Sequence, residues 1–207
     1  MPVLGRLHLI TDTRGGRDPL PVLRAALDAG GPELVVQVRA TSGLGDAAAY
    51  RLACAAAALC ADAGATCLVN DRLHVALAAG IRGGHVGADD LPVAAARRVL
   101  GPAALLGATA RDPRTALSAV AAGADYLGGG PCHATTTKPG LPPPIGADGI
   151  RAVAAAVDVP VIAIGGVTVA RVAALRAAGA YGVAVVAALA DADDPGRETT
   201  RLLAALR

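Results

Sequence analysis

Short apolar runs alternate with longer alanine-rich runs along the whole chain. The short runs have the residue types and length of buried strands, and the longer runs have those of helices. Strands that alternate with helices in this way imply a parallel sheet with crossover connections. The predicted strands are residues 7–11, 34–39, 66–70, 84–87, 104–109, 126–130, 160–164 and 182–187. The predicted helices are residues 20–29, 46–63, 73–79, 92–100, 113–122, 147–157, 168–178 and 195–206.

Eight such strand–helix units in 207 residues favour a closed barrel over an open sheet. We therefore predict an α/β fold, a single (β/α)8 TIM barrel, with one domain over residues 1–207. An open doubly wound sheet is the alternative, and it usually has a glycine-rich turn after its first strand. The corresponding turn here, residues 12–16, lacks that glycine spacing.

Composition argues against two classes of partner. The chain has no Trp and no Phe, a net charge of +2 and scattered arginines, so nothing indicates base stacking or a polyanion-binding surface. Its apolar runs are shorter than the roughly 20 residues of a membrane helix, and the first residues lack a signal-peptide pattern. The four cysteines lack metal-ligand spacing, which is typical of reduced thiols. We predict a cytoplasmic protein that binds neither nucleic acid nor membranes.

Polar side chains follow the second, third and fourth predicted strands, where a barrel has its active site. Gln37 and Arg39 share one face at the end of the second strand, and burying them without partners would be costly. Asn70 and Asp71 follow the third strand, and Asp90 follows the fourth. These residues could instead cap the next helices. On neighbouring strands, Asp71 and Asp90 can share a hard cation, and Mg²⁺ fits better than zinc because no His/Cys set converges there.

The segment after the sixth strand has the features of a phosphate site. Lys138 is the only lysine in the chain, and it follows Thr135 and Thr137 in a glycine-rich segment. A compact ammonium on a flexible stem differs from the guanidinium found at every other basic position. Gly166 follows the seventh strand, where small residues let backbone N–H groups approach a phosphate. We predict that phosphorylated small molecules bind at this rim.

The histidines give weaker signals. His8 and His85 lie within predicted strands, which favours a structural role for both. His74 lies on an early helical turn and is predicted to face solvent. His133 lies in the segment after the sixth strand, where it could meet a substrate.

Taken together, these segments resemble the thiamine phosphate synthase family, which also contains the related thiazole tautomerases. The matching segments span nearly the whole chain, in the family's order and at the matching strand ends. They are LITD (9–12), VQVR (36–39), VNDR (69–72), HVGADDLP (85–92), GATA (107–110), ADYLGGGPCHATTTKPG (124–140), PVIAIGGVT (160–168) and GVAVVAAL (182–189).

The resemblance implies a Mg²⁺-dependent transferase with small phosphorylated substrates. Synthases of this family join a hydroxymethylpyrimidine diphosphate to a thiazole phosphate, giving thiamine phosphate and diphosphate. The family's metal ligands match Asp71 and Asp90, and its pyrimidine contact matches Gln37. The contacts to diphosphate match Arg39, Asn70, Thr109 and Lys138, and those to the thiazole phosphate match Thr135, Thr137 and Gly166. Catalytic roles would thus belong to Arg39, Thr109 and Lys138.

The chain also departs from the family's pattern. Thr41 stands where synthases usually have a diphosphate-binding lysine, Ala88 replaces a glutamine, and Thr109 and Ala187 each replace a serine. The retained acids and Lys138 favour a synthase, which is the leading hypothesis. The missing lysine and glutamine favour the alternative of a thiazole tautomerase-type isomerase acting on a thiazole phosphate carboxylate. A non-catalytic ligand-binding barrel is the third hypothesis, and assembly as a homo-oligomer stays open.

Overall fold

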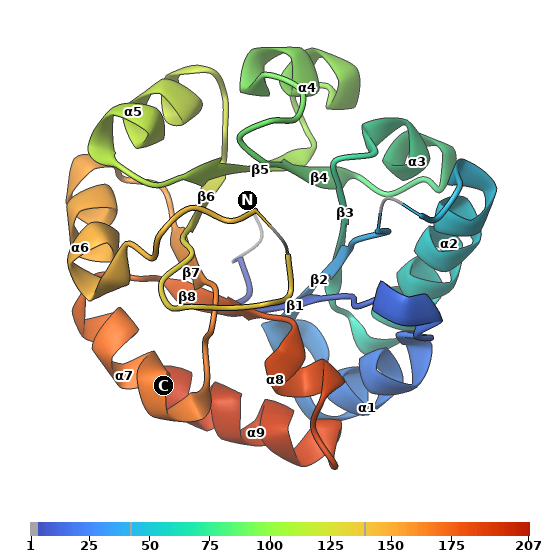
Figure 1. Ribbon diagram of the computed structural model, residues 1–207. Helices are drawn as coiled ribbons and strands as arrows, with labels where there is room; N and C mark the ends of the chain where they lie inside the picture. The colour runs from blue at the N-terminus through green and yellow to red at the C-terminus, as the bar shows by residue number, and fades with distance from the viewer. Residues whose placement is uncertain (1–3, 42, 139) are drawn as a thin grey trace.

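The computed structural model describes residues 4–41, 43–138 and 140–207, and these residues form a closed barrel of eight parallel strands. The strands follow one another around the barrel in chain order, and the last pairs with the first. Figure 1 shows the helices as an outer ring around the strands. The predicted single (β/α)8 barrel is therefore confirmed. Residues 1–3 of the predicted domain, and Pro139 of the 124–140 segment, lie outside the described residues.

The predicted elements agree with the observed ones to within two residues at each end. The strands are β1 (Leu7–Ile10), β2 (Leu34–Val38), β3 (Thr66–Asn70), β4 (Gly83–Val86), β5 (Leu105–Ala110), β6 (Tyr126–Gly129), β7 (Val161–Ile164) and β8 (Gly182–Val185). The helices are α1 (Leu20–Gly30), α2 (Asp46–Ala63), α3 (Leu73–Ala78), α4 (Val93–Leu100), α5 (Pro113–Ala121), α6 (Gly146–Ala156), α7 (Val169–Ala177), α8 (Ala187–Ala190) and α9 (Pro195–Leu206). The short α8 and the 3-10 turns η1 (Arg14–Gly16) and η2 (Gly31–Glu33) were not predicted, because a single turn is too short to show an apolar period.

Inward-pointing side chains from alternate strand positions fill the barrel. The apolar part of this filling includes Ile10, Val35, Leu68, Tyr126 and Ile162. The Tyr126 ring, 1% exposed, fits only because Gly107 on the neighbouring strand has no side chain. A Cβ at Gly107 would lie 2.1 Å from Cζ of Tyr126. The interior is therefore built around one large aromatic ring.

The helices α2, α4 and α5 bury mainly alanines, whereas α6, α7 and α9 bury mainly larger aliphatic side chains. Both described ends of the chain lie at the amino-terminal end of the strands. Arg6, just before β1, donates from Nη1 to the carbonyl oxygen of Leu206 at the end of α9 over 3.3 Å. The Tyr181 hydroxyl, just before β8, donates to the carbonyl oxygen of Leu4 over 2.7 Å. The carboxyl ends of the strands are thus left free of the termini. In the described part of the chain, no helix combines the length and apolarity needed to cross a membrane.

His8 on β1 points into the barrel and should make the fold sensitive to acid. Burial and the nearby His85 lower the pKa of His8 to about 3, and its Nε2 has no hydrogen-bond partner among the described residues. An unfolded histidine has a pKa of about 6.5, so below that pH the unfolded chain binds the extra proton and the folded one does not. The stability that neutral His8 contributes is therefore present above about pH 6.5 and lost as the pH falls toward 3.

We expect the free energy of unfolding of the unsubstituted protein to fall by about 2 kcal/mol more than that of His8→Asn between pH 7 and pH 5. Urea unfolding at each pH measures this difference. Because other titrating groups are common to both proteins, their effects cancel in the comparison. Parallel pH curves for the two proteins would contradict a neutral, buried His8.

Candidate active site

The carboxyl ends of β2 and β3 bring Gln37 and Asn70 together at the mouth of the barrel. In the parallel register Gln37 lies opposite Leu68, two residues before Asn70. Gln37 is 4% exposed, and its Nε2 donates a hydrogen bond to Oδ1 of Asn70. Each amide thus satisfies part of the other's hydrogen-bonding capacity, which lets both side chains stay at the buried end of the site.

Asp71 and Asp90 meet beside this pair, at the ends of β3 and β4. Asp71 has a left-handed backbone with φ of 62°, and its N–H donates to the carbonyl oxygen of His85 over 2.9 Å. Oδ2 of Asp90 accepts a hydrogen bond of 2.7 Å from the N–H of Gly87. Left-handed residues other than glycine are uncommon and cluster at functional sites. Backbone hydrogen bonds therefore help to hold both carboxylates in place.

The two carboxyl groups interact, and their pKa values move in opposite directions. Burial, the hydrogen bond to Asp90 and the charge of Asp90 raise the pKa of Asp71 to about 7. Burial acts on Asp90 in the same direction, but hydrogen bonds from Asp71 and from the N–H of Gly87 bring its pKa below the usual value. Within the described ranges no three His, Cys, Asp or Glu side chains gather as a metal cluster. The pair can therefore supply two carboxylates, and a cation there would need other oxygen ligands.

The acidic residues do not cap the following helices with their side chains. The residue before α3 is Arg72 and the residue before α4 is Pro92, and neither helix start has a side-chain cap hydrogen bond. The alternative that Asn70, Asp71 and Asp90 cap the next helices with their side chains is therefore wrong. Asp71 and Asp90 stay available to a ligand at the rim.

Arg39 is held at the end of β2 by Thr11 from the end of β1. The N–H of Arg39 donates to Oγ1 of Thr11 over 2.8 Å, and that hydroxyl donates to the carbonyl oxygen of Arg39 over 3.1 Å. Burial lowers the pKa of Arg39, and its buried Nε has no hydrogen-bond partner among the described residues. A half-buried guanidinium with an unused donor is suited to an anionic ligand.

The segment between β6 and α6 crosses the mouth of the barrel, as the yellow trace in Figure 1 shows. Arg14, in η1 after β1, donates from Nη1 to the carbonyl oxygen of Thr136 over 3.3 Å. Arg39 donates from Nη2 to the carbonyl oxygen of Thr137 over 3.4 Å. The segment therefore reaches from β6 to the far side of the barrel and covers the predicted site from above.

This crossing segment carries Thr135, Thr137 and Lys138. The hydroxyl oxygens of the two threonines lie 3.1 Å apart. Lys138 is exposed, and its positive charge lowers the pKa of Asp71, against the stronger effect of burial. The predicted lysine therefore lies close enough to the predicted acidic pair to affect the pKa values of both acids.

Gly166 lies where the segments after β6 and β7 meet. It has φ of 61°, and a Cβ there would lie 2.7 Å from the carbonyl oxygen of Ala134. Next to it, the N–H of His133 donates to the carbonyl oxygen of Gly165 over 3.0 Å. Only glycine fits this backbone, because its lack of a side chain lets the segment after β6 pack closely against it. His133, which could meet a substrate by its sequence position, is half-buried beside this junction.

Thr109 on β5 contacts a histidine that the sequence pattern favours as structural. Nε2 of His85 lies 3.1 Å from the Thr109 hydroxyl, and Nδ1 lies 3.2 Å from the Tyr126 hydroxyl. His85 points into the barrel directly beneath the predicted site. The one available signal for its role was its position near the end of β4. His74, in contrast, is exposed as predicted and pairs with Asp46.

Two arginines that contact the crossing segment were also not predicted. Arg14 holds its middle, as described above. Arg111, just after β5, donates from Nε to the carbonyl oxygen of Gly130 over 3.2 Å and from Nη2 to that of Pro143 over 2.6 Å. Arg111 therefore ties the start of the segment to its end. Both arginines follow strand ends, which is the signal that could have identified them.

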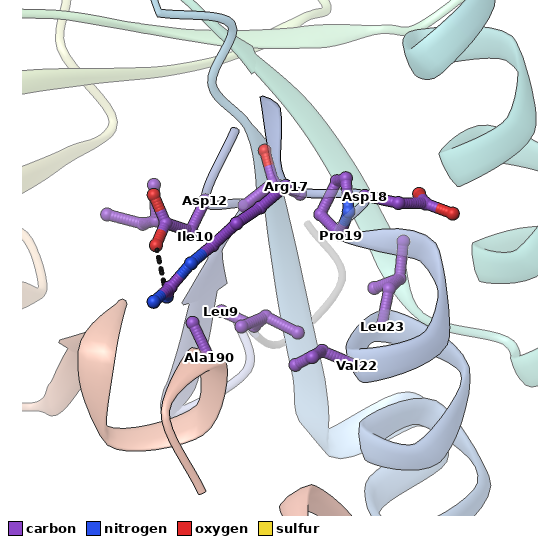
Figure 2. A pocket seen from close by; sticks show the side chains of 10 residues that line it. Leu9, Ile10, Asp12, Arg17, Asp18, Pro19, Val22, Leu23 and Ala190 are labelled. Carbon is purple, nitrogen blue, oxygen red and sulfur yellow. Dashed lines mark hydrogen bonds and ion pairs between the residues drawn. The ribbon is translucent and has the colours of Figure 1, made fainter. Parts of the chain in front are cut away.

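A hollow of about 260 Å³ lies outside the barrel wall, between β1, α1 and α8 (Figure 2). Its lining is mainly apolar and includes Leu9, Val22 and Leu23. Arg17 extends along it and pairs with Asp12 over 3.1 Å. The hollow contains none of the predicted site residues, so the candidate active site is the barrel mouth and not this cavity.

Comparisons with known proteins agree with the fold and the sequence motifs. A model of the thiamine monophosphate synthase family matches residues 7–189. A thiamine-phosphate synthase of Salinispora arenicola is 69% identical over 206 residues, which cover 100% of this chain and 99% of the relative. A bifunctional thiamine biosynthesis protein of Symbiobacterium thermophilum is 49% identical over 148 residues, which cover 72% of this chain and 31% of that protein.

Among solved structures, a thiamine phosphate pyrophosphorylase from Pyrococcus furiosus matches with a TM-score of 0.87 and 30% identity, covering 97% of this chain and 95% of that chain. These findings confirm the predicted family, a synthase-like function and the transferase class. The chain therefore belongs to the thiamine monophosphate synthase family.

Proposed function

We propose that this chain is a Mg²⁺-dependent thiamine-phosphate synthase of the cytoplasm, which joins a hydroxymethylpyrimidine diphosphate to a thiazole phosphate and releases diphosphate. The observation that carries the proposal is the meeting of Asp71 and Asp90 beside the half-buried guanidinium of Arg39. Mg²⁺ in proteins is typically bound by one or two carboxylates together with phosphate oxygens and water. The printed names of the most similar relatives support the same activity.

The acidic pair fits a divalent cation by its chemistry. The two half-buried carboxylates repel each other, and the raised pKa of Asp71, about 7, reflects burial and that repulsion. A cation bound to oxygens of both carboxylates would offset their repulsion and favour the doubly ionised pair. When bound by Asp71 and Asp90, Mg²⁺ would neutralise part of the charge of the substrate diphosphate.

The remaining polar groups of the rim suit the leaving diphosphate. When the bond from the pyrimidine methylene carbon to oxygen breaks, the electron pair leaves with the diphosphate and negative charge grows there. Donors aimed at that growing charge stabilise the transition state more than the ground state. Arg39, Thr109 and Lys138 would supply such donors, with Asn70 beside them. The step needs no general base with an unusual pKa, so positioning and charge carry the catalysis.

The second substrate would lie under the crossing segment. Thr135 and Thr137 present hydroxyls there, and the backbone of Gly166 packs against Ala134 of the same segment. Hydroxyl and backbone N–H donors at small residues are the usual partners of a single phosphate group. We assign the thiazole phosphate to this side and the pyrimidine ring to the side of Gln37.

Synthesis of thiamine phosphate from the two purified substrates tests this function. We expect equal amounts of thiamine phosphate and diphosphate, formed only with Mg²⁺ and stopped by a chelator. A parallel assay offers a thiazole phosphate carboxylate alone and follows its isomerisation. Isomerisation without any thiamine phosphate would replace the synthase with the tautomerase, and no reaction in either assay would favour the non-catalytic barrel.

The departure at Thr41 gives a gain-of-function prediction. Thr41 lies two residues after Arg39, and its N–H donates to Oγ1 of Thr13 over 3.1 Å. A lysine there could reach the phosphates that Arg39 contacts, and a charge contact of about 1.4 kcal/mol in the transition state gives about a tenfold rise. We therefore expect Thr41→Lys, alone or with Ala88→Gln, to raise kcat/KM for thiamine phosphate formation.

Steady-state kinetics with limiting pyrimidine diphosphate measures this rise. Thr200→Lys is the matched control, because it adds the same charge at an exposed position on α9. Unchanged kcat/KM in the Thr41 variants would show that the missing lysine is not what limits this enzyme.

A further inference from the structure

Thr109, His85 and Tyr126 form a chain of hydrogen bonds that runs from the site into the barrel. His85 Nε2 lies 3.1 Å from the Thr109 hydroxyl, and His85 Nδ1 lies 3.2 Å from the Tyr126 hydroxyl. His85 is 8% exposed and Tyr126 is 1% exposed. The upper end of the chain, Thr109, lies at the rim, and the lower end is closed off from solvent. Thr109 is therefore the most exposed of the three residues.

Two glycines make this arrangement sterically possible. Gly107, opposite Tyr126 in the register of β5 and β6, leaves room for the ring. Gly128, opposite Thr109, leaves room for His85: a Cβ at Gly128 would lie 3.1 Å from Cε1 of the imidazole. The side chains of Tyr126 and His85 are thus confined by the neighbouring strands. Their positions follow from the barrel itself and not from a flexible loop.

Only one direction of proton donation satisfies all three groups. Among the described residues, the hydrogen-bond partners of the His85 ring are the hydroxyls of Tyr126 at Nδ1 and Thr109 at Nε2. Burial lowers the pKa of His85 most, the charge of Asp90 raises it and that of Lys138 lowers it. Burial also raises the pKa of Tyr126, so its hydroxyl keeps its proton.

In the described residues, His85 Nδ1 is the one hydrogen-bond partner of the Tyr126 hydroxyl. If Nδ1 carried the proton, the Tyr126 hydroxyl would be a buried donor without an acceptor, which is unfavourable. If the Tyr126 hydroxyl donates to Nδ1, the imidazole proton lies on Nε2 and is donated to Thr109. The Thr109 oxygen then accepts from below, and its own hydrogen is free to point outward.

We propose that His85 and Tyr126 are positioning residues that orient the Thr109 hydroxyl as a donor toward the leaving diphosphate. The proposal rests on the synthase function proposed above. A free threonine hydroxyl can donate or accept, and only the donating orientation stabilises an anion. Residues inside the barrel thereby determine that the Thr109 hydroxyl donates, although they do not contact the substrate themselves.

A double-substitution cycle tests the coupling. Tyr126→Phe keeps the ring and removes the hydroxyl, and Thr109→Val keeps the shape of residue 109 and removes its hydroxyl. We expect Tyr126→Phe to lower kcat by about tenfold, in the range of coupling between groups in one hydrogen-bond network, with KM changed little. In the Thr109→Val background the same change should leave kcat unaltered. Equal losses in both backgrounds would mean that Tyr126 acts only through the general packing of the barrel.

Tyr181→Phe is the matched control. It removes a tyrosine hydroxyl bonded to the carbonyl oxygen of Leu4 at the opposite end of the barrel. We expect it to lower the thermal midpoint without changing kcat. A similar loss of kcat in this control would show that any weakened tyrosine bond slows the enzyme, and would overturn the proposal.

Nitrogen-15 NMR of labelled histidine gives a readout that does not depend on activity. The His85 resonances, assigned with His85→Gln, should report a proton on Nε2 and an unprotonated, hydrogen-bonded Nδ1. In Tyr126→Phe the Nδ1 shift should move toward that of a free acceptor. A proton on Nδ1 in the unsubstituted protein would overturn the proposal. If the predicted tautomer is found but the protein has no synthase activity, the hydrogen-bond network is supported and the proposed function is wrong.

Discussion

Asp71→Asn is expected to lower kcat for thiamine phosphate formation by about 100- to 1000-fold, the scale of losing one group that stabilises transition-state charge. The amide keeps the size of the carboxyl group but removes a negative charge from the pair with Asp90. Asparagine also tolerates a left-handed backbone such as the φ of 62° at Asp71, whereas alanine would add strain there. The asparagine variant therefore separates the loss of a metal ligand from a change in the backbone.

Initial rates over a series of Mg²⁺ concentrations measure this effect, and Asp90→Asn should behave similarly. Asp89→Asn is the matched control. This neighbouring carboxylate is exposed, and the described groups that act on the pKa of Asp71 do not include it. Asp71→Asn should also relieve the repulsion between the two acids, so the metal-free variant should unfold at a higher temperature near pH 8. Full activity in either variant of the pair would remove the metal site from the mechanism.

Lys138→Ala should weaken binding of inorganic diphosphate by about 100-fold, the effect of truncating one partner of a close charge pair. Binding of the thiazole phosphate should change far less, because its assigned contacts are Thr135, Thr137 and Gly166. Lys138→Arg should restore diphosphate binding only in part, since a planar guanidinium presents its charge in a different shape from a compact ammonium.

Calorimetric titration with inorganic diphosphate and Mg²⁺ compares these variants. Arg151→Ala on α6 serves as the control, because it removes an exposed cation that pairs with Asp148 and not with a residue of the predicted site. Equal diphosphate affinities in the unsubstituted protein and both Lys138 variants would exclude the lysine from the diphosphate site. A loss of the same size in Arg151→Ala would attribute the effect to net charge alone.

The fold was predictable because each strand and helix carries its own local signal. The helix over residues 46–63, for example, was predicted with the bounds that it has. The acids at the strand ends were predictable for a similar reason, since a barrel places those ends at one rim. The left-handed backbone of Asp71 had no comparable signal, because it depends on the hydrogen bond from its N–H to His85 on the next strand.

The interior of the barrel was the part that the sequence did not reveal. The role of His85 depends on the register of three strands, which places Gly107 opposite Tyr126 and Thr109 opposite Gly128. A single sequence shows which residues alternate along one strand, but it does not show which residues face each other across strands. A histidine in a strand thus resembles any buried structural histidine until the register is known.

The ends of the chain have a consequence for how this barrel can be joined to other proteins. Arg6 and Leu206 meet at the amino-terminal end of the strands, on the face opposite the mouth. A second domain fused at either end would therefore leave the entrance for substrates open, and linking the ends would allow new termini elsewhere. The bifunctional relative from Symbiobacterium thermophilum, of which the matched segment is 31%, shows that a homologous segment occurs within a longer chain. The described ends of the chain and the candidate active site thus lie at opposite ends of the barrel.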